Sequence, residues 1–401
     1  MNTLRRLTGA ALIALAIVTC GRALAGADAD SAAVYASSHE LESKRQYADA
    51  LKVLDLVSPK DKSSYFFLLR CAWLNYCNGR YDEAALGYDK AARTTPGTLE
   101  PLVGKILAES ALNKWDDVEK TALAIAKADP GNYTARSSLA YALFLRRRYR
   151  ESQDAYEGVL KLYPCDLTMQ AGLGWALLWQ GKRREAVKVF RDILEISPAN
   201  EGAARAIGKD APPTPSASAT AYQRSYQAEA EGNYAEGLKA LDDVGADAKQ
   251  TYVYNLRCGW LNYLLAQHDK SAAAYAVAAK LAPGAVQPLL GKVQPEMALA
   301  KWDDAAKTME AAKALDPRNY TVRSKLAYAC YFLNRFQDAE RLYQEILREY
   351  PGDLAARSGL AWSQLKLDKK ADAIREFKSI LQVYPTHELA TKGLEAAQAA
   401  K

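Results

Sequence analysis

Prolines recur at one spacing along most of the chain, and this spacing constrains the fold more than any other feature of the sequence. They stand at Pro96, Pro130, Pro164 and Pro198, and again at Pro283, Pro317, Pro351 and Pro385, with 34 residues between neighbours in each set. A fixed period of about 20–50 residues is typical of repeat proteins, in which a unit buries its apolar face only against its neighbours. Because proline cannot continue a helix, each proline predicts a helix end. We therefore expect a row of short helical units.

Small and bulky residues alternate within these units at helical spacing. Ala84 is followed four residues later by Tyr88, and Ala186 is followed in the same way by Phe190. Residues four apart lie on one face of a helix. The small residue lets a second helix approach closely, and the ring then fills the space at the next turn. The pattern predicts paired helices in each unit.

A second, longer periodicity relates the two halves of the chain. Adding 187 to a residue number in the first half gives its counterpart in the second half without a gap. Trp73-Leu74-Asn75-Tyr76 matches Trp260-Leu261-Asn262-Tyr263, and Asn132-Tyr133-Thr134 matches Asn319-Tyr320-Thr321. In the second pair of segments each asparagine follows a proline turn, which is a favoured position for a helix N-cap. The chain is therefore an internal duplication.

The period of 34 and the small-and-bulky pattern resemble the tetratricopeptide repeat, and the resemblance covers nearly all of the chain after its first 25 residues. It implies an all-α fold, a tetratricopeptide-type alpha-solenoid with two tandem arrays of about five helical hairpins each. We place the first array at 26–207 and the second at 219–401. Residues 208–218 form a linker rich in proline, serine and alanine, and its prolines predict a stiff connector.

The N-terminus has the features of a secretory signal peptide. Arg5-Arg6 precedes a short apolar stretch from Leu7 to Thr19, and Ala23-Leu24-Ala25 supplies small residues at a cleavage site. These features predict a signal peptide over residues 1–25 and a mature protein in the periplasm. The apolar stretch is too short to span a bilayer, which takes about 20 residues. An alternative places Cys20 at a lipoprotein cleavage site, which would give an outer-membrane lipoprotein.

Charge and motif content exclude several classes of function. The formal net charge of +6 includes three arginines of the leader, and the remaining charges are interspersed, so we expect no nucleic-acid partner. The five cysteines after the leader are an odd number in a large chain, which argues against a disulfide framework. The histidines His39, His268 and His387 are far apart, and no phosphate-binding, zinc-hydrolase or nucleophile motif is present. We expect no enzymatic activity, no cofactor and no metal.

Aromatic residues occupy the helix positions that, by the resemblance, face the concave groove of the array. These residues are Trp73, Tyr76, Tyr141, Phe144, Trp175, Trp179, Trp260, Tyr263, Tyr328, Tyr331, Phe332 and Trp362. One interpretation is that the rings pack on neighbouring helices and close the interior of the superhelix. The other is that they bind a partner, because aromatic side chains bury much area at low entropy cost.

Two hypotheses about function follow from this aromatic groove. The first is a non-enzymatic scaffold or adaptor of the cell envelope that binds a protein or peptide partner. The alternative, implied by resemblance to exported repeat proteins, is a polysaccharide-associated binding module of an exopolysaccharide secretion or assembly system. Self-association through an open array end is a third option. The clamp with which some family members grip a C-terminal carboxylate is absent, since its lysine position holds Leu69, Val103, Ser137 and Ala171.

Two lysine–glutamate pairs stand at positions where an apolar residue is expected. Lys105 precedes Glu109 by four residues, and Lys292 precedes Glu296 by four. This spacing allows a structural ion pair on one helix face, which a buried charge would require. A lysine that buries its stem and extends its charge outward is a second interpretation, and a role in ligand binding is a third.

Overall fold

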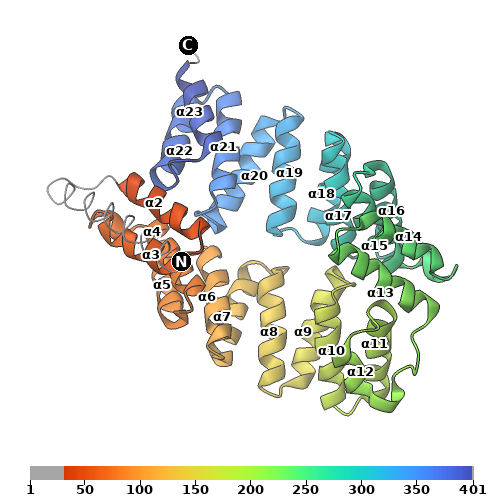
Figure 1. Cartoon of the computed structure of the whole chain (residues 1–401). Helices are drawn as coiled ribbons and strands as arrows, with labels where there is room; N and C mark the ends of the chain where they lie inside the picture. Colours follow the sequence, from red (N-terminus) through yellow and green to blue (C-terminus); the bar gives the residue numbers. More distant parts are fainter. Residues whose placement is uncertain (1–30, 400–401) are drawn as a thin grey trace, which may run out of the picture.

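The computed structural model describes residues 31–399, and over this range the chain consists of helices joined by short turns, without strands (Figure 1). The predicted all-α fold is therefore confirmed. The expected signal peptide over residues 1–25, with Cys20, lies outside the described residues. Within 31–399 no helix has the length and apolar character needed to cross a membrane. The five cysteines of this range are all free thiols.

The first array contains five helical hairpins, and we call the first helix of each hairpin helix A and the second helix B. The hairpins are α2 (Ser31–Ser43) with α3 (Tyr47–Val53), α4 (Tyr65–Cys77) with α5 (Tyr81–Thr94), α6 (Glu100–Ala111) with α7 (Trp115–Ala128), α8 (Tyr133–Leu145) with α9 (Tyr149–Leu162), and α10 (Leu167–Trp179) with α11 (Arg183–Ile196). A single short helix, α12 (Glu201–Ile207), packs on the last hairpin.

The second array repeats this order. Its hairpins are α13 (Ala217–Ala230) with α14 (Tyr234–Lys239), α15 (Tyr252–Leu264) with α16 (His268–Leu281), α17 (Gln287–Ala298) with α18 (Trp302–Leu315), α19 (Tyr320–Phe332) with α20 (Phe336–Glu349), and α21 (Leu354–Lys366) with α22 (Lys370–Val383), followed by α23 (Glu388–Ala399). Short 3-10 turns cover Leu54–Leu56, Asp61–Ser63, Gly208–Asp210, Ala240–Asp243 and Ala248–Gln250. Of the linker expected at 208–218, only residues 211–216 lie between helical segments.

Local sequence signals set the helix ends. The side-chain oxygens of Asn132 and Asn319 accept hydrogen bonds from the backbone N–H groups of Ala135 and Val322, both at 3.1 Å, so the two predicted N-caps are confirmed. These bonds satisfy backbone donors that the first turn of a helix leaves without partners. The matching caps, 187 residues apart, show the duplication at atomic detail.

At five places among residues 31–399, an aromatic ring from helix B packs against a glycine of the next helix. The ring of Tyr343 packs against Gly359 in the following helix A, where a Cβ atom would lie 2.3 Å from the tyrosine Cζ. The same contact recurs between Tyr88 and Gly104, Tyr156 and Gly172, Tyr275 and Gly291, and Phe377 and Gly393. A side chain on the glycine would collide with the ring, so this contact explains why small and bulky residues alternate along the sequence.

The two arrays lie side by side and make reciprocal contacts through the turns between helix B and the next helix A. The backbone N–H of Leu99 donates to the carbonyl of Glu349 at 2.8 Å, and that of Val286 donates to the carbonyl of Leu162 at 3.0 Å. Val286 is the counterpart of Leu99, and Glu349 is the counterpart of Leu162. The halves are therefore related by a pseudo-twofold axis, as expected when a duplicated surface pairs with itself.

Two side-chain hydrogen bonds follow the same reciprocal pattern, but their acceptors differ in charge. Glu100 accepts a hydrogen bond from the backbone N–H of Gly352 at 2.7 Å, whereas its counterpart Gln287 accepts one from Cys165 at 3.2 Å. A charged acceptor makes the shorter bond. Burial raises the pKa of Glu100, although the hydrogen bond from Gly352 opposes this effect. One array–array contact thus contains a buried carboxylate, and the equivalent contact is neutral.

The reciprocal packing closes the molecule into a ring (Figure 1). Next to the linker, α11 packs against α13, and on the opposite side α22 packs against α2 without a covalent connection. At this second junction His39 Nε2 lies 3.1 Å from the carbonyl oxygen of Val383, and the His39 ring lies 4.5 Å from that of Tyr384. The first and last hairpins of the chain are therefore neighbours in space.

Glu100→Gln tests the buried carboxylate between the arrays. A raised pKa in the folded state means that folding favours the protonated acid. This contribution to stability is complete below the pKa of the unfolded chain and is lost as the pH rises through the folded pKa. We expect thermal unfolding to show the variant gaining stability relative to the parent between pH 4 and pH 8. A difference that stays constant with pH would contradict the assignment.

Ala266→Gly tests the turn between α15 and α16. Ala266 has a φ of 55°, and its counterpart Gly79 has a φ of 76°. Left-handed backbone is strained for alanine and relaxed for glycine. We expect Ala266→Gly to raise the free energy of unfolding by about 1 kcal/mol, measured by chemical denaturation. The reverse exchange, Gly79→Ala, should lower it by a similar amount. Two changes of the same sign would show that packing, not backbone strain, dominates.

Candidate functional site

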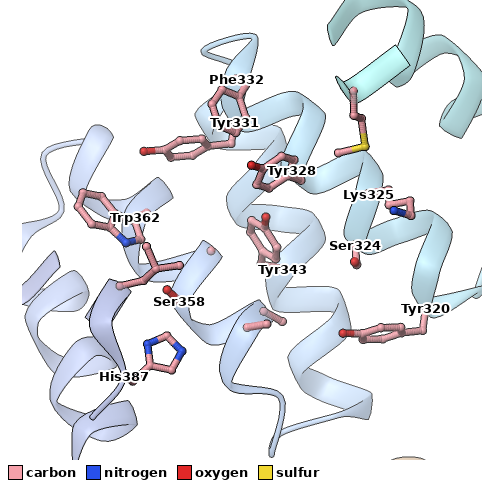
Figure 2. Close-up of a pocket in the computed structure, with 15 residues that line it drawn as sticks. Tyr320, Ser324, Lys325, Tyr328, Tyr331, Phe332, Tyr343, Ser358, Trp362 and His387 are labelled. Atoms are coloured by element: carbon pink, nitrogen blue, oxygen red, sulfur yellow. The ribbon is translucent and has the colours of Figure 1, made fainter. Parts of the chain in front are cut away.

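An aromatic cavity of the second array lies between the A helices α19 and α21 and has a volume of about 580 Å³ (Figure 2). Tyr328 comes from α19, Trp362 from α21 and Tyr343 from helix B α20. Tyr343 is the ring that packs against Gly359, so the contact that joins the two hairpins also forms part of the cavity wall. We call this cavity the α19–α21 pocket.

The α19–α21 pocket brings together four of the residues that the sequence analysis assigned to the groove. They are Tyr328, Tyr331, Phe332 and Trp362. Tyr328 and Phe332 remain 44% and 43% exposed, although the Phe332 ring stacks on that of Trp302 with ring centroids 4.4 Å apart. Part of each ring therefore faces solvent where a partner could cover it.

A second cavity, of about 550 Å³, contains Trp260 at the junction of the two arrays. Trp260 Nε1 donates to Glu229 Oε1 at 2.6 Å. The guanidinium group of Arg257 also pairs with Glu229 and lies 3.9 Å from the centre of the Tyr226 ring. The polar groups of this cavity satisfy one another. Trp260 therefore has a structural partner.

The remaining aromatic residues of the predicted groove pack on neighbouring rings to different degrees. Trp73 stacks on Tyr76, Trp260 on Tyr263, Tyr141 meets Trp115, Phe144 and Trp179 both meet Tyr149, and Trp175 meets Phe190. Trp73 Nε1 also donates to Glu42 at 2.7 Å, as Trp260 does to Glu229. Tyr141 and Trp179 are nevertheless 49% and 61% exposed. All of these rings pack on neighbours, and some of them also keep a large exposed area.

Both lysine–glutamate pairs form ion pairs in the structure. Lys105 Nζ lies 3.7 Å from Glu109, and Lys292 Nζ lies 3.0 Å from Glu296. The two glutamates are buried, with 3% exposure, and the lysines are partly exposed. Lys105 also pairs with Asp89 at 3.0 Å. Each lysine therefore pairs with a buried carboxylate while its own charge stays near solvent, and Oε2 of each glutamate has no hydrogen-bond partner among residues 31–399.

The α19–α21 pocket contains three notable polar groups, and two of the residues that carry them, Lys325 and Ser358, were not predicted from the sequence. Lys325 is half-buried, and burial lowers the pKa of its ammonium group. Ser358 Oγ and Trp362 Nε1 are buried and have no hydrogen-bond partner among residues 31–399. The available signal was helical spacing, since Ser358 precedes Trp362 by four residues and Lys325 precedes Tyr328 by three. That spacing places each polar group beside an aromatic residue already assigned to the groove.

The chemistry of the α19–α21 pocket is that of a binding site. Its walls are mostly aromatic and aliphatic, and Lys325 is the only lysine, arginine, aspartate or glutamate in its lining. Apolar cavities with a few well-placed polar groups are the usual form of ligand sites. Across residues 31–399 no group of histidine, cysteine, aspartate and glutamate side chains is arranged to hold a metal ion.

Family models described as tetratricopeptide repeat match residues 146–201 and 292–353 in one case and residues 333–397 in another. The chain is a tetratricopeptide repeat protein. The matched segments lie in both arrays, and two of them include α19, α20 or α21. Tetratricopeptide repeats generally mediate interactions between proteins, and proteins of this fold are typically scaffolds without enzymatic activity.

Solved structures with a similar fold have low sequence identity to this chain. A thermophilic tetratricopeptide repeat protein of Thermus thermophilus is 15% identical, with 43% of this chain and 95% of that chain covered and a TM-score of 0.33. A tetratricopeptide repeat protein from Parabacteroides merdae is 12% identical, with 65% and 96% covered and a TM-score of 0.33. The APC/C hetero-tetramer Cut9–Hcn1 gives 13% identity, 92% and 83% coverage and a TM-score of 0.38. No curated protein sequence matches this chain.

Proposed function

We propose that this protein is an exported, non-enzymatic adaptor that binds a segment of a partner protein in the α19–α21 pocket. The observation that carries the proposal is the pocket itself, about 580 Å³ in volume and lined largely by aromatic rings. Tyr328 and Phe332 remain more than two-fifths exposed in it. Aromatic side chains at the centre of an interface supply a large share of binding energy, because they bury much area and lose little entropy.

The closed arrangement of the two arrays supports this proposal because it holds the pocket rigid. Reciprocal hydrogen bonds at Leu99 and Val286 hold the two arrays together, and α22 packs on α2 at the far junction. A preformed pocket loses less conformational entropy when a partner binds, and this raises the affinity obtained from a given contact area. The ring therefore suits a protein that presents a fixed surface to a partner.

The proposal also includes the compartment in which the protein acts. The basic and apolar residues of 1–25 support export to the periplasm, and lipidation at Cys20 is the alternative form of the mature N-terminus. A protein partner would then be a component of the cell envelope. The polysaccharide-binding alternative and groove binding by the first array remain untested predictions from the sequence, and the proposal made here includes neither.

Exchange of two exposed rings tests the adaptor function. Tyr328→Ser combined with Phe332→Ala removes aromatic area from the α19–α21 pocket. The partner is the protein that the parent protein retains from envelope extract. We expect the mature protein carrying both changes to bind this partner at least about tenfold more weakly, because such a loss is typical of a central aromatic contact. Affinity is measured with the purified partner after identification by mass spectrometry.

The first array supplies the matched control. Tyr141→Ser with Leu145→Ala changes the counterparts of the same two positions, which are 49% and 38% exposed. We expect this variant to bind the partner with the affinity of the parent protein. Circular dichroism and thermal unfolding must show that both variants fold. If the second-array variant folds and binds unchanged, the assignment of function to the α19–α21 pocket is wrong.

A further inference from the structure

The two halves of the chain differ in polar chemistry at the positions that line the α19–α21 pocket in the second array. Lys325 has Ser138 as its counterpart, and Ser358 has Ala171, while tryptophan stands at both 362 and 175. The second array therefore carries a cation and a hydroxyl group at two positions where the first array has Ser138 and Ala171. Residues that differ between otherwise matched surfaces identify where the two surfaces recognise different chemistry.

The cation of the α19–α21 pocket lacks a counter-charge. Neither the lining of the pocket nor any ion pair among residues 31–399 supplies a carboxylate to Lys325, and burial is the one cause of its lowered pKa. Removing a charged group from water is costly unless a partner of opposite charge compensates it. In the second cavity, by contrast, Arg257 is paired with Glu229. The α19–α21 pocket is therefore complementary to a negative charge.

Two further groups in this pocket have unused donors. Ser358 is 3% exposed, and neither its hydroxyl group nor Trp362 Nε1 has a hydrogen-bond partner among the described residues. A buried donor without a partner is unfavourable, so binding an acceptor is favourable. In Figure 2, Lys325 lies on one side of the pocket and Ser358 and Trp362 lie on the other, with Tyr343 between them.

This arrangement needs a ligand with separated polar groups and an apolar middle. A small inorganic anion would satisfy Lys325 alone and would leave the opposite wall without an acceptor. An extended peptide has carbonyl acceptors at every residue and places successive side chains on opposite sides, so it can reach both walls. Its apolar side chains would cover Tyr328 and Tyr343, and only an aspartate or glutamate would meet Lys325 with a charge.

We propose that the α19–α21 pocket binds an extended acidic peptide segment of the partner, with an aspartate or glutamate side chain paired to Lys325 and a backbone carbonyl accepting from Ser358 or Trp362. This inference rests on the proposed adaptor function and specifies the partner's chemistry. It differs from the gripping of a C-terminal carboxylate, because the segment continues past the pocket on both sides.

Three blocked peptides test the charge preference, with the sequence Ac-Ser-Phe-X-Val-Phe-Ser-NH2 and X as glutamate, glutamine or lysine. Calorimetric titration of the mature protein is expected to show the glutamate peptide binding at least about tenfold more tightly than the glutamine peptide, and the lysine peptide most weakly. The preference should decrease as salt is raised, because added ions screen a partly exposed pair. Equal affinity for glutamate and glutamine, or no binding of either peptide, overturns the proposal.

Two variants of Lys325 assign the preference to this residue. Lys325→Ser introduces the residue that the first array carries at position 138, and it should bind the glutamate and glutamine peptides equally. Lys325→Arg keeps the charge and should keep the preference. Unchanged circular dichroism shows that both variants fold. A glutamate preference that persists in Lys325→Ser contradicts the assignment. A glutamine peptide with a free C-terminal carboxylate that binds more tightly than the blocked glutamine peptide also contradicts it.

The same variants separate this inference from the proposed function. If Tyr328→Ser with Phe332→Ala abolishes partner binding and Lys325→Ser leaves it unchanged, the adaptor function stands and the acidic segment is wrong. If neither variant changes partner binding, the pocket is not the partner site and both proposals fail. Loss of binding in both variants supports both proposals.

Discussion

Several hairpin junctions of this protein depend on one contact, in which an aromatic ring of helix B fills the space left by a glycine of the next helix. At Tyr343 and Gly359 the space is so limited that a single added carbon would lie 2.3 Å from the ring. Close packing of this kind fixes both the distance and the orientation of neighbouring hairpins. Tyr343 also lines the α19–α21 pocket, so the contact that builds the array shapes the candidate binding site as well.

Duplication then determines how the two arrays associate. Two copies of one surface can pair reciprocally, and the hydrogen bonds from Leu99 and Val286 show this directly. The apolar core also crosses the boundary, because Leu162 belongs to a cluster made mostly of second-array residues. An isolated array would expose these groups to solvent. The closed ring covers them, and it leaves the exposed aromatic rings of the A helices as the surface available to a partner.

Periodicity predicted the hairpins and the asparagine caps because these features depend on residues close together in sequence, and the gapless match at an offset of 187 predicted the duplication. Ring closure was not predictable, since it depends on contacts such as that between His39 and Val383, which are 344 residues apart. The individual role of each aromatic residue was not predictable from the sequence either. Trp260 and Trp362 occupy equivalent helix positions. Trp260 Nε1 donates a hydrogen bond to Glu229, whereas Trp362 Nε1 has no hydrogen-bond partner among the described residues. Sequence spacing alone cannot separate a satisfied side chain from an unsatisfied one.

Hydrogen–deuterium exchange of the mature protein with and without its purified partner tests the central claim most directly, since it locates the binding site without altering any residue. We expect slower exchange in 320–332 and 354–366, which form the walls of the α19–α21 pocket. Exchange should stay unchanged in their first-array counterparts, 133–145 and 167–179. Protection confined to the first array, or to B helices away from the pocket, would contradict this claim.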